Sequence, residues 1–274
     1  MVFEKHHPLV FKGFAATVPL GLAYIAAYLE RSGHQVHVID FQIGNFDIAD
    51  EIRTFKPNML GLSICSPALP HAKEIAAIAR KTDPNLAIIA GGPHVSFFRE
   101  AMFKEIPELD LIVPGEGELV TTNLADRLSK NGVLDVPGVI YRQGTEFVST
   151  GVEPQVEDLS NLPMLPLHLF NVRKYYPLPG NFRQLPSIAM STSRGCPYQC
   201  TFCNKGIWTH KARVRPPLSV VDDIEAAVRK YHAREVYFVD ELFTMKRANV
   251  VTFCESFCVG IYGSDGSAVR GWIP

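Results

Sequence analysis

Residues 59–93 read MLGLSICSPALPHAKEIAAIARKTDPNLAIIAGGP. Two short apolar strands, Met59–Ile64 and Leu86–Ala90, flank a helical stretch at Ala68–Arg80. Strands that are apolar at nearly every position are typical of sheets covered on both faces, and a strand–helix–strand order joins neighbouring strands in parallel. The segment therefore predicts a doubly wound α/β sheet.

The alternation of strands and helices continues on both sides of this segment. Upstream, Pro19–Leu29 reads as a helix and Gln35–Asp40 reads as a strand. Downstream, Leu109–Val113 reads as a strand and is followed by a helix that runs to Ser129. Only Leu9–Phe14 (LVFKGF) offers a strand before the first helix, so either it is the first strand or the N-terminal part is incomplete.

Small and polar residues follow each predicted strand. In doubly wound sheets ligands bind outside the carboxyl ends of the strands, where these residues would gather. The sequence therefore predicts a binding edge, and its tips are Asp40, Ser63, Gly91–Gly92 and Gly115–Glu118.

The rest of the chain predicts a connecting segment and a second domain. We expect the doubly wound domain over 1–135, a hairpin and Pro-rich linker over 136–186, and a second domain over 187–274. Six prolines between 154 and 186 disfavour long helices there. The elements expected in the last two segments are a hairpin of 139–142 with 147–149, strands at 187–191 and 235–239, and helices at 220–231 and from Lys246.

The composition is that of an ordinary globular protein. Of 274 residues 47% are hydrophobic, and the formal net charge of −1 gives no general attraction to nucleic acid. No apolar run approaches the ~18 residues that a membrane span needs. The N-terminal residues lack the apolar core of a signal peptide. We expect a cytoplasmic protein with no transmembrane segment.

Three cysteines are clustered directly after the strand at 187–191. Cys196, Cys200 and Cys203 form a C-x3-C-x2-C pattern, whose spacing lets one loop present three thiolates to one metal centre. Iron–sulfur clusters are held by cysteine runs of this kind, normally with four thiolates. Three thiolates on a four-iron cluster would leave one iron open to a substrate or co-substrate.

A zinc site is the alternative interpretation, with His210 as a distant fourth ligand. Structural zinc usually pairs two short Cys or His knuckles, and the chain has no second knuckle. Cys254 and Cys258 have helical spacing and predict a buried helix face instead.

The cysteine loop resembles that of the radical S-adenosylmethionine enzymes, whose hallmark is Cys-x3-Cys-x-aromatic-Cys after the first strand of a partial (β/α)6 barrel. Phe202 stands at the aromatic position. The resemblance implies a [4Fe-4S] cluster on the three cysteines, S-adenosylmethionine on the open iron, and Phe202 against the adenine. It also implies that Asp240 and Glu241 hold the methionine amino group; a solvated strand end is the alternative for these two acids.

A basic run follows the cysteine loop. It has two interpretations: an ordinary solvated loop, or charge compensation for the anionic cluster or an anionic substrate. Its residues are Lys205, Lys211, Arg213 and Arg215.

The N-terminal domain resembles the Rossmann-like domain of the cobalamin-dependent subfamily of these enzymes. The matching stretches are Pro19–Tyr24, Gly61–Ser63, Gly91–Ser96 and Gly115–Glu118. The resemblance implies that cobalamin contacts this domain, and glycines would let a flat macrocycle approach the backbone. The cofactor-binding residues expected there are Ser63, Gly91, Gly92, Pro93, His94, Glu116 and Gly117.

One motif departs from the pattern of cobalamin carriers, which present Asp-x-His-x-x-Gly after the second strand. Here Asp40 is followed by Phe41 and Gln42, so glutamine stands in the place of the histidine. We therefore expect that cobalt, if cobalamin binds, takes no histidine from this loop. His94 is an alternative ligand, or else a cap or turn residue after Gly-Gly-Pro.

The resemblance implies reductive cleavage of S-adenosylmethionine to a 5′-deoxyadenosyl radical, for methyl transfer or cyclisation on a small molecule. It also implies an electron donor such as flavodoxin or ferredoxin. Two alternatives remain: a non-catalytic cobalamin or corrinoid carrier, and a radical enzyme that binds no cobalamin. Residues 187–274 are too few for six strand–helix units of roughly 30 residues each, so we expect a shortened barrel.

Overall fold

The computed structural model describes residues 2–3, 16–128, 136–178, 180–204, 207–208 and 211–262. The chain divides into two compact units. The first lies within residues 21–156 together with the N-terminal strand, and the second lies within 157–262 together with 16–20. None of the helices in these ranges is both long and apolar enough to cross a bilayer.

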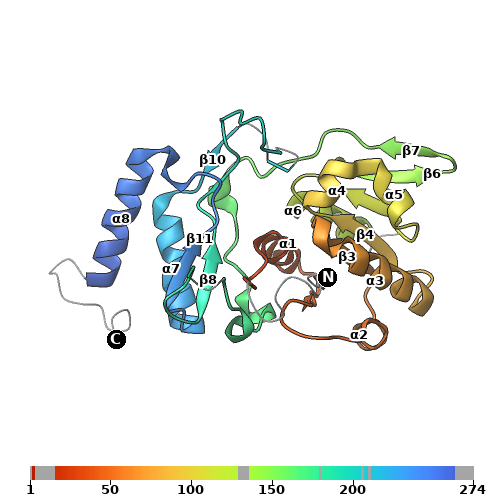
Figure 1. Cartoon of the computed structure of the whole chain (residues 1–274), viewed down its shortest axis with the longest axis horizontal. Coiled ribbons are helices and arrows are strands. Elements are labelled where there is room, and N and C mark those ends of the chain that lie inside the picture. The colour runs from red at the N-terminus through yellow and green to blue at the C-terminus, as the bar shows by residue number, and fades with distance from the viewer. Residues whose placement is uncertain are drawn as a thin grey trace. The chain divides into compact units, whose positions relative to one another are not determined.

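The first unit is built on a seven-stranded sheet in the order β2-β1-β3-β4-β5-β6-β7. Figure 1 labels β3, β4, β6 and β7 of this sheet. Strands β1 to β5 pair in parallel, and β6 and β7 pair antiparallel at one side. The strands are β1 Val2–Phe3, β2 Ile39–Asp40, β3 Met59–Ser63, β4 Ala87–Gly91, β5 Leu111–Val113, β6 Ile140–Gln143 and β7 Glu146–Ser149. This sheet confirms the predicted α/β class.

Helices cover both faces of this sheet. They are α1 Leu20–Arg31, α2 Ile48–Phe55, α3 Leu69–Thr82, α4 Pro93–Phe98, α5 Met102–Glu105 and α6 Glu118–Leu128. Side chains alternate between the faces of a strand. Ile88 and Ala90 of β4 therefore join a core with α2, α3, α4 and α5, whereas Ile89 joins a second core with α6.

The first strand differs from the expected one. Val2–Phe3 pairs with both β2 and β3, and Leu9–Phe14 lies outside the described residues. A two-residue strand carries too little periodicity to be found from sequence. Helix α2 was not expected either; Asp47 caps its start by accepting a hydrogen bond from the Asp50 backbone N.

The hairpin over 140–149 belongs to the first sheet and not to a connecting segment. Strand β6 pairs with β5, and Ile140 is fully buried in the core. In the described part of the Pro-rich segment the helical elements are three 3-10 turns, η3 Leu159–Asn161, η4 Leu167–Leu169 and η5 Val172–Lys174. The segment is also more than a linker, because apolar residues between the prolines are buried. These residues are Leu159, Leu162, Leu165, Leu167, Phe170, Val172 and Tyr175.

The second unit contains a parallel strand–helix–strand motif. Strand β8, Ser187–Met190, pairs in parallel with β11, Glu235–Phe238, and helix α7, Pro217–Tyr231, connects them. Beyond β11 lie the 3-10 turn η6, Phe243–Met245, and helix α8, Arg247–Tyr262. These elements match the expected start of a (β/α) domain.

A short antiparallel ladder, absent from the sequence expectations, stands inside this motif. Strand β9, Ser193–Arg194, pairs with β10, Arg213–Val214. Each has only two residues, which is again too short for a sequence pattern. The ladder closes the base of the loop that carries the three clustered cysteines.

Gly92 tests how tightly the strand ends are packed. Its φ is +97°, and an added Cβ would lie 2.9 Å from both the N and the O of Ile64. We expect Gly92→Ala to lower the free energy of unfolding by about 1–3 kcal/mol. Gly21→Ala is the matched control, because Gly21 is exposed in α1 with open space around its Cα. This control should instead raise stability by ~0.5–1 kcal/mol, as measured by denaturant unfolding; equal effects would contradict the prediction.

Candidate functional site

The carboxyl ends of β3, β4 and β5 lie in register at one edge of the first sheet. Ser63 is paired with Gly91, and Gly91 with Val113. The glycines at this edge serve close packing within the chain: a Cβ on Gly91 would be 3.2 Å from the Val113 carbonyl oxygen. A Cβ on Gly92 would also lie 3.2 Å from the Ser63 hydroxyl. The close approach that the glycines permit is therefore between neighbouring strand ends.

Pro93 and His94 form the first turn of α4. The His94 side chain is buried, its Nδ1 lies 2.9 Å from Ser66 Oγ, and its ring centroid lies 4.3 Å from that of Phe98. Its backbone N donates to the Ile64 carbonyl at 3.0 Å. Burial lowers the pKa of this imidazole, an effect that the Glu105 carboxylate partly opposes. His94 is thus a packed helix residue that links two loops of the edge.

Glu116 and Gly117 follow β5 and are also engaged within the first unit. The buried Glu116 carboxylate accepts a hydrogen bond from the Val156 backbone N at 3.1 Å. A Cβ on Gly117 would lie 2.6 Å from Ile25 Cδ1 of α1. The Gly115 backbone N donates to Ser96 Oγ at 3.0 Å. Together with the His94 contacts, these bonds join the loops after β3, β4 and β5 into one surface.

The loop after β2 presents no imidazole. Asp40 is buried and accepts a hydrogen bond from the Gln42 backbone N at 2.9 Å, which forms the turn that follows the strand. Gln42 occupies the position at which cobalamin carriers have histidine. Since an amide is a much poorer ligand for cobalt than an imidazole, this loop offers no strong axial ligand.

The cysteine loop leaves β9 of the second unit through Gly195, whose φ is +79°. Cys196 is partly exposed, Cys200 and Cys203 are exposed, and all three thiols are free of disulfides. The Cys203 backbone N donates to the Cys200 carbonyl at 3.1 Å, a turn that keeps the last two cysteines close along the chain. Phe202 is 91% exposed between them.

The donor set of this loop fits an iron–sulfur cluster better than a closed zinc site. Thiolates are soft ligands suited to iron–sulfur clusters, and three of them come from eight consecutive residues. Among the described residues no three His, Cys, Asp or Glu side chains are gathered at metal-binding range. His210 lies outside the described residues. The loop therefore supplies three thiolate ligands, and binding of a cluster would bring these thiolates together.

Cys254 and Cys258 of α8 are exposed, so the expected buried helix face is wrong. Aromatic residues of α8 make the inward contacts instead: Phe253 lies 5.5 Å from the Phe238 ring and stacks on Phe257 at 5.5 Å. Four-residue spacing marks one face of a helix, but neighbouring side chains decide which face is covered.

The two acids after β11 have different surroundings. The Asp240 carboxylate accepts hydrogen bonds from Thr192 and Ser193, which follow β8. The Glu241 side chain is exposed. The resemblance implied that Asp240 and Glu241 both hold the methionine amino group. In the structure Asp240 is hydrogen-bonded within the chain, whereas Glu241 is exposed.

Two of the basic residues after the cysteine loop, Lys211 and Arg215, form ion pairs within the second unit. Lys211 forms an exposed ion pair with Glu157. Arg215 is buried and donates to the buried Asp223 at 2.8 Å; burial raises the Asp223 pKa, and Arg215 opposes this rise. A buried ion pair of this kind fixes geometry more than it adds stability. The solvated-loop interpretation does not describe Arg215, and Lys205 lies outside the described residues.

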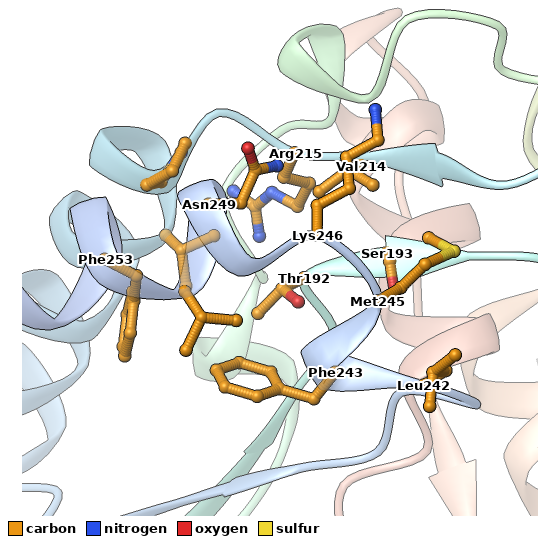
Figure 2. A pocket seen from close by; sticks show the side chains of 13 residues that line it. Thr192, Ser193, Val214, Arg215, Leu242, Phe243, Met245, Lys246, Asn249 and Phe253 are labelled. Carbon is orange, nitrogen blue, oxygen red and sulfur yellow. The ribbon is translucent and has the colours of Figure 1, made fainter.

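A pocket that the sequence did not indicate lies beside these residues (Figure 2). It is bounded by Thr192 and the start of β9, by β10, by η6, and by the N-terminal parts of α7 and α8. Figure 2 shows Arg215, Lys246 and Asn249 along one side and Phe243 across from them. Its lining residues are Thr192, Ser193, Val214, Arg215, Pro217, Val220, Leu242, Phe243, Met245, Lys246, Asn249, Val250 and Phe253.

Burial of His94 predicts a pH dependence of stability. Its pKa in the folded chain is below the ordinary 6.5, so below pH 6.5 the unfolded chain takes up a proton that the folded chain does not. Stability contributed by the neutral imidazole is therefore lost as the pH falls from 6.5 toward the folded pKa. We expect His94→Gln to lose less stability than the wild type over this range, measured as thermal unfolding midpoints. The same loss in both proteins would contradict this.

Comparison with known proteins places the first unit in a described family. A model of the B12-binding domain matches residues 8–125. An uncharacterized methyltransferase of Pyrococcus horikoshii is 31% identical over 238 residues, which cover 85% of this chain and 50% of that protein. The anaerobic magnesium-protoporphyrin IX monomethyl ester cyclase of Rubrivivax gelatinosus is 31% identical over 247 residues, covering 86% of this chain and 44% of the cyclase. The chain thus spans half or less of the length of these relatives.

A solved structure extends the likeness over both units. The cobalamin-dependent S-adenosylmethionine radical enzyme OxsB, with aqua-cobalamin bound, superposes with a TM-score of 0.74 and 25% identity. The match covers 91% of this chain and 35% of that one. A B12-binding domain, a three-cysteine loop on a following strand–helix domain and these relatives confirm the resemblance: the chain belongs to the cobalamin-binding radical S-adenosylmethionine family.

Proposed function

We propose that this chain binds cobalamin on its first unit, and a [4Fe-4S] cluster with S-adenosylmethionine on its second. It would cleave S-adenosylmethionine reductively for methyl transfer or cyclisation on a small-molecule substrate. The observation that carries the proposal is the loop after β9, which presents Cys196, Cys200 and Cys203 within eight residues and outside any disulfide. The B12-binding match on the preceding residues supports the cobalamin part.

The cysteine loop has the properties that the proposed chemistry needs. Three thiolates leave one iron of a four-iron cluster without a protein ligand, and the amino and carboxylate groups of S-adenosylmethionine would bind there. When bound and reduced, the cluster supplies the electron that cleaves the sulfonium to methionine and a 5′-deoxyadenosyl radical. Exposed Phe202 offers an aromatic face to the adenine, and exposed Glu241 offers a carboxylate to the amino group.

The first unit would hold cobalamin at the edge formed by the loops after β3, β4 and β5. Ser63, Glu116 and the backbone around Gly91 lie at this edge. The His94 ring is buried and packs against Phe98, and this burial disfavours it as the cobalt ligand. Cobalamin held at this edge would then have no histidine of the chain on cobalt, and it would supply the chemistry of methyl transfer.

Reduction of the cluster requires an external one-electron donor, for which flavodoxin or ferredoxin is the expected class. Free thiols that assemble a cluster also require a reducing compartment, which favours the cytoplasm.

Replacing any loop cysteine should abolish cluster assembly. After anaerobic reconstitution we expect about four irons per wild-type chain, and little iron with Cys196→Ala, Cys200→Ala or Cys203→Ala. Cys254→Ala and Cys258→Ala are matched controls, because they remove exposed thiols from α8. Iron and sulfide analysis with visible absorption measures the outcome. Stoichiometric zinc without iron in anaerobically purified protein would refute the proposal.

Cobalamin bound to the chain should lack a protein imidazole. We expect the electron paramagnetic resonance spectrum of the Co(II) form to show no nitrogen hyperfine splitting from a protein imidazole, because Gln42 replaces the histidine and His94 is buried against Phe98. Splitting that disappears in His94→Ala would overturn this assignment. Cobalamin binding without any cluster in the wild type would instead favour the non-catalytic carrier.

A further inference from the structure

The Asp240 carboxylate ties the end of β11 to the segment that follows β8. It accepts hydrogen bonds from the Thr192 backbone N at 2.9 Å, from Thr192 Oγ1 at 2.9 Å, and from Ser193 Oγ. These partners lie 48 and 47 residues away in the sequence. An ionised carboxylate has about four acceptor sites. All three of these bonds end on Oδ1, and Oδ2 also lies 3.1 Å from the Thr192 backbone N, so Oδ1 is fully used within the chain.

The same segment is also held on its other side. The Thr192 carbonyl accepts a hydrogen bond from the Arg215 backbone N at 2.8 Å, and Ser193 and Arg194 pair with β10. Figure 2 shows Thr192 and Ser193 at the pocket wall near Arg215. The segment that leads to Cys196 is thus held by two sets of hydrogen bonds. Asp240 bonds to Thr192 and Ser193, and Arg215 and β10 bond to the backbone of the same segment.

We propose that Asp240 is a positioning residue that holds Thr192 and Ser193, and through them the start of the cysteine loop, in the place where the cluster binds. The inference rests on the proposed cluster site. It replaces the role that the resemblance implied for Asp240, contact with the methionine amino group, and leaves that role to exposed Glu241. Since the loop thiols are not gathered among the described residues, a fixed loop base lowers the conformational entropy that cluster binding must overcome.

Amide hydrogen exchange on the chain without its cluster tests the contact itself. Asp240→Asn keeps the size of the side chain and removes its charge. We expect exchange at the Thr192 and Arg215 amides to become roughly tenfold faster, the factor that corresponds to losing one charge-assisted hydrogen bond. Glu241→Gln and Asp222→Asn are matched controls that remove one negative charge at exposed sites, and exchange at these amides should not change in them.

Iron release tests the role in the cluster site. In reconstituted protein without S-adenosylmethionine, we expect Asp240→Asn to lose iron to a chelator faster than the wild type and to broaden the resonance of the reduced cluster. Thr192→Val removes one partner hydroxyl and should have a smaller effect. The combined variant should lose iron no faster than Asp240→Asn alone, because both act through the same contact. A residue that only binds S-adenosylmethionine would not affect these measurements.

Each outcome decides one part of the inference. Unchanged amide exchange in a folded Asp240→Asn protein would overturn the contact, and unchanged exchange in Thr192→Val would do so if Asp240→Asn does not fold. Faster exchange with unchanged iron release would overturn the positioning role. Failure of the wild type to assemble a cluster would refute the proposed function, while the exchange data would still decide whether Asp240 holds the segment.

Discussion

Parallel strand pairing is the constraint on which the rest of this molecule depends. In the first unit it aligns Ser63 with Gly91 and Gly91 with Val113, and in the second it aligns Met190 with Phe238. Parallel neighbours need a crossover connection, so each strand end runs into a loop that leads to a helix or turn. Within each unit these loops therefore leave from one edge. Both sequences proposed to bind cofactors are loops of this kind.

The carboxylates at these edges hydrogen-bond to the loops and so hold the edges together. A buried carboxylate is unfavourable unless it is hydrogen-bonded. Buried Asp40 bonds to the turn after β2, buried Glu116 bonds to the Val156 amide, and partly buried Asp240 bonds to the segment before Cys196. These contacts fix the loops, whereas Phe202 and Glu241 beside them are exposed.

Sequence reasoning succeeded where a periodic segment was long enough. The helices α1, α3, α6 and α7 and the strands β3, β4, β5, β8 and β11 lie close to where their patterns predicted them. It failed for β1, β9 and β10, which have two residues each and are defined only by their partners. The prediction that the Pro-rich segment is only a linker is wrong. Proline prevents long helices, but the leucines between the prolines can still pack into a core.

The sequence by itself determined the α/β class, the tips of the parallel strands and the three-thiol loop, because each of these follows from local spacing along the chain. Only the tertiary structure decided which polar groups meet. That Asp240 bonds to Thr192, and His94 to Ser66, depends on the register of strands far apart in the sequence. Local periodicity records which face of an element is buried, but the partner across that face is set by how the elements pack.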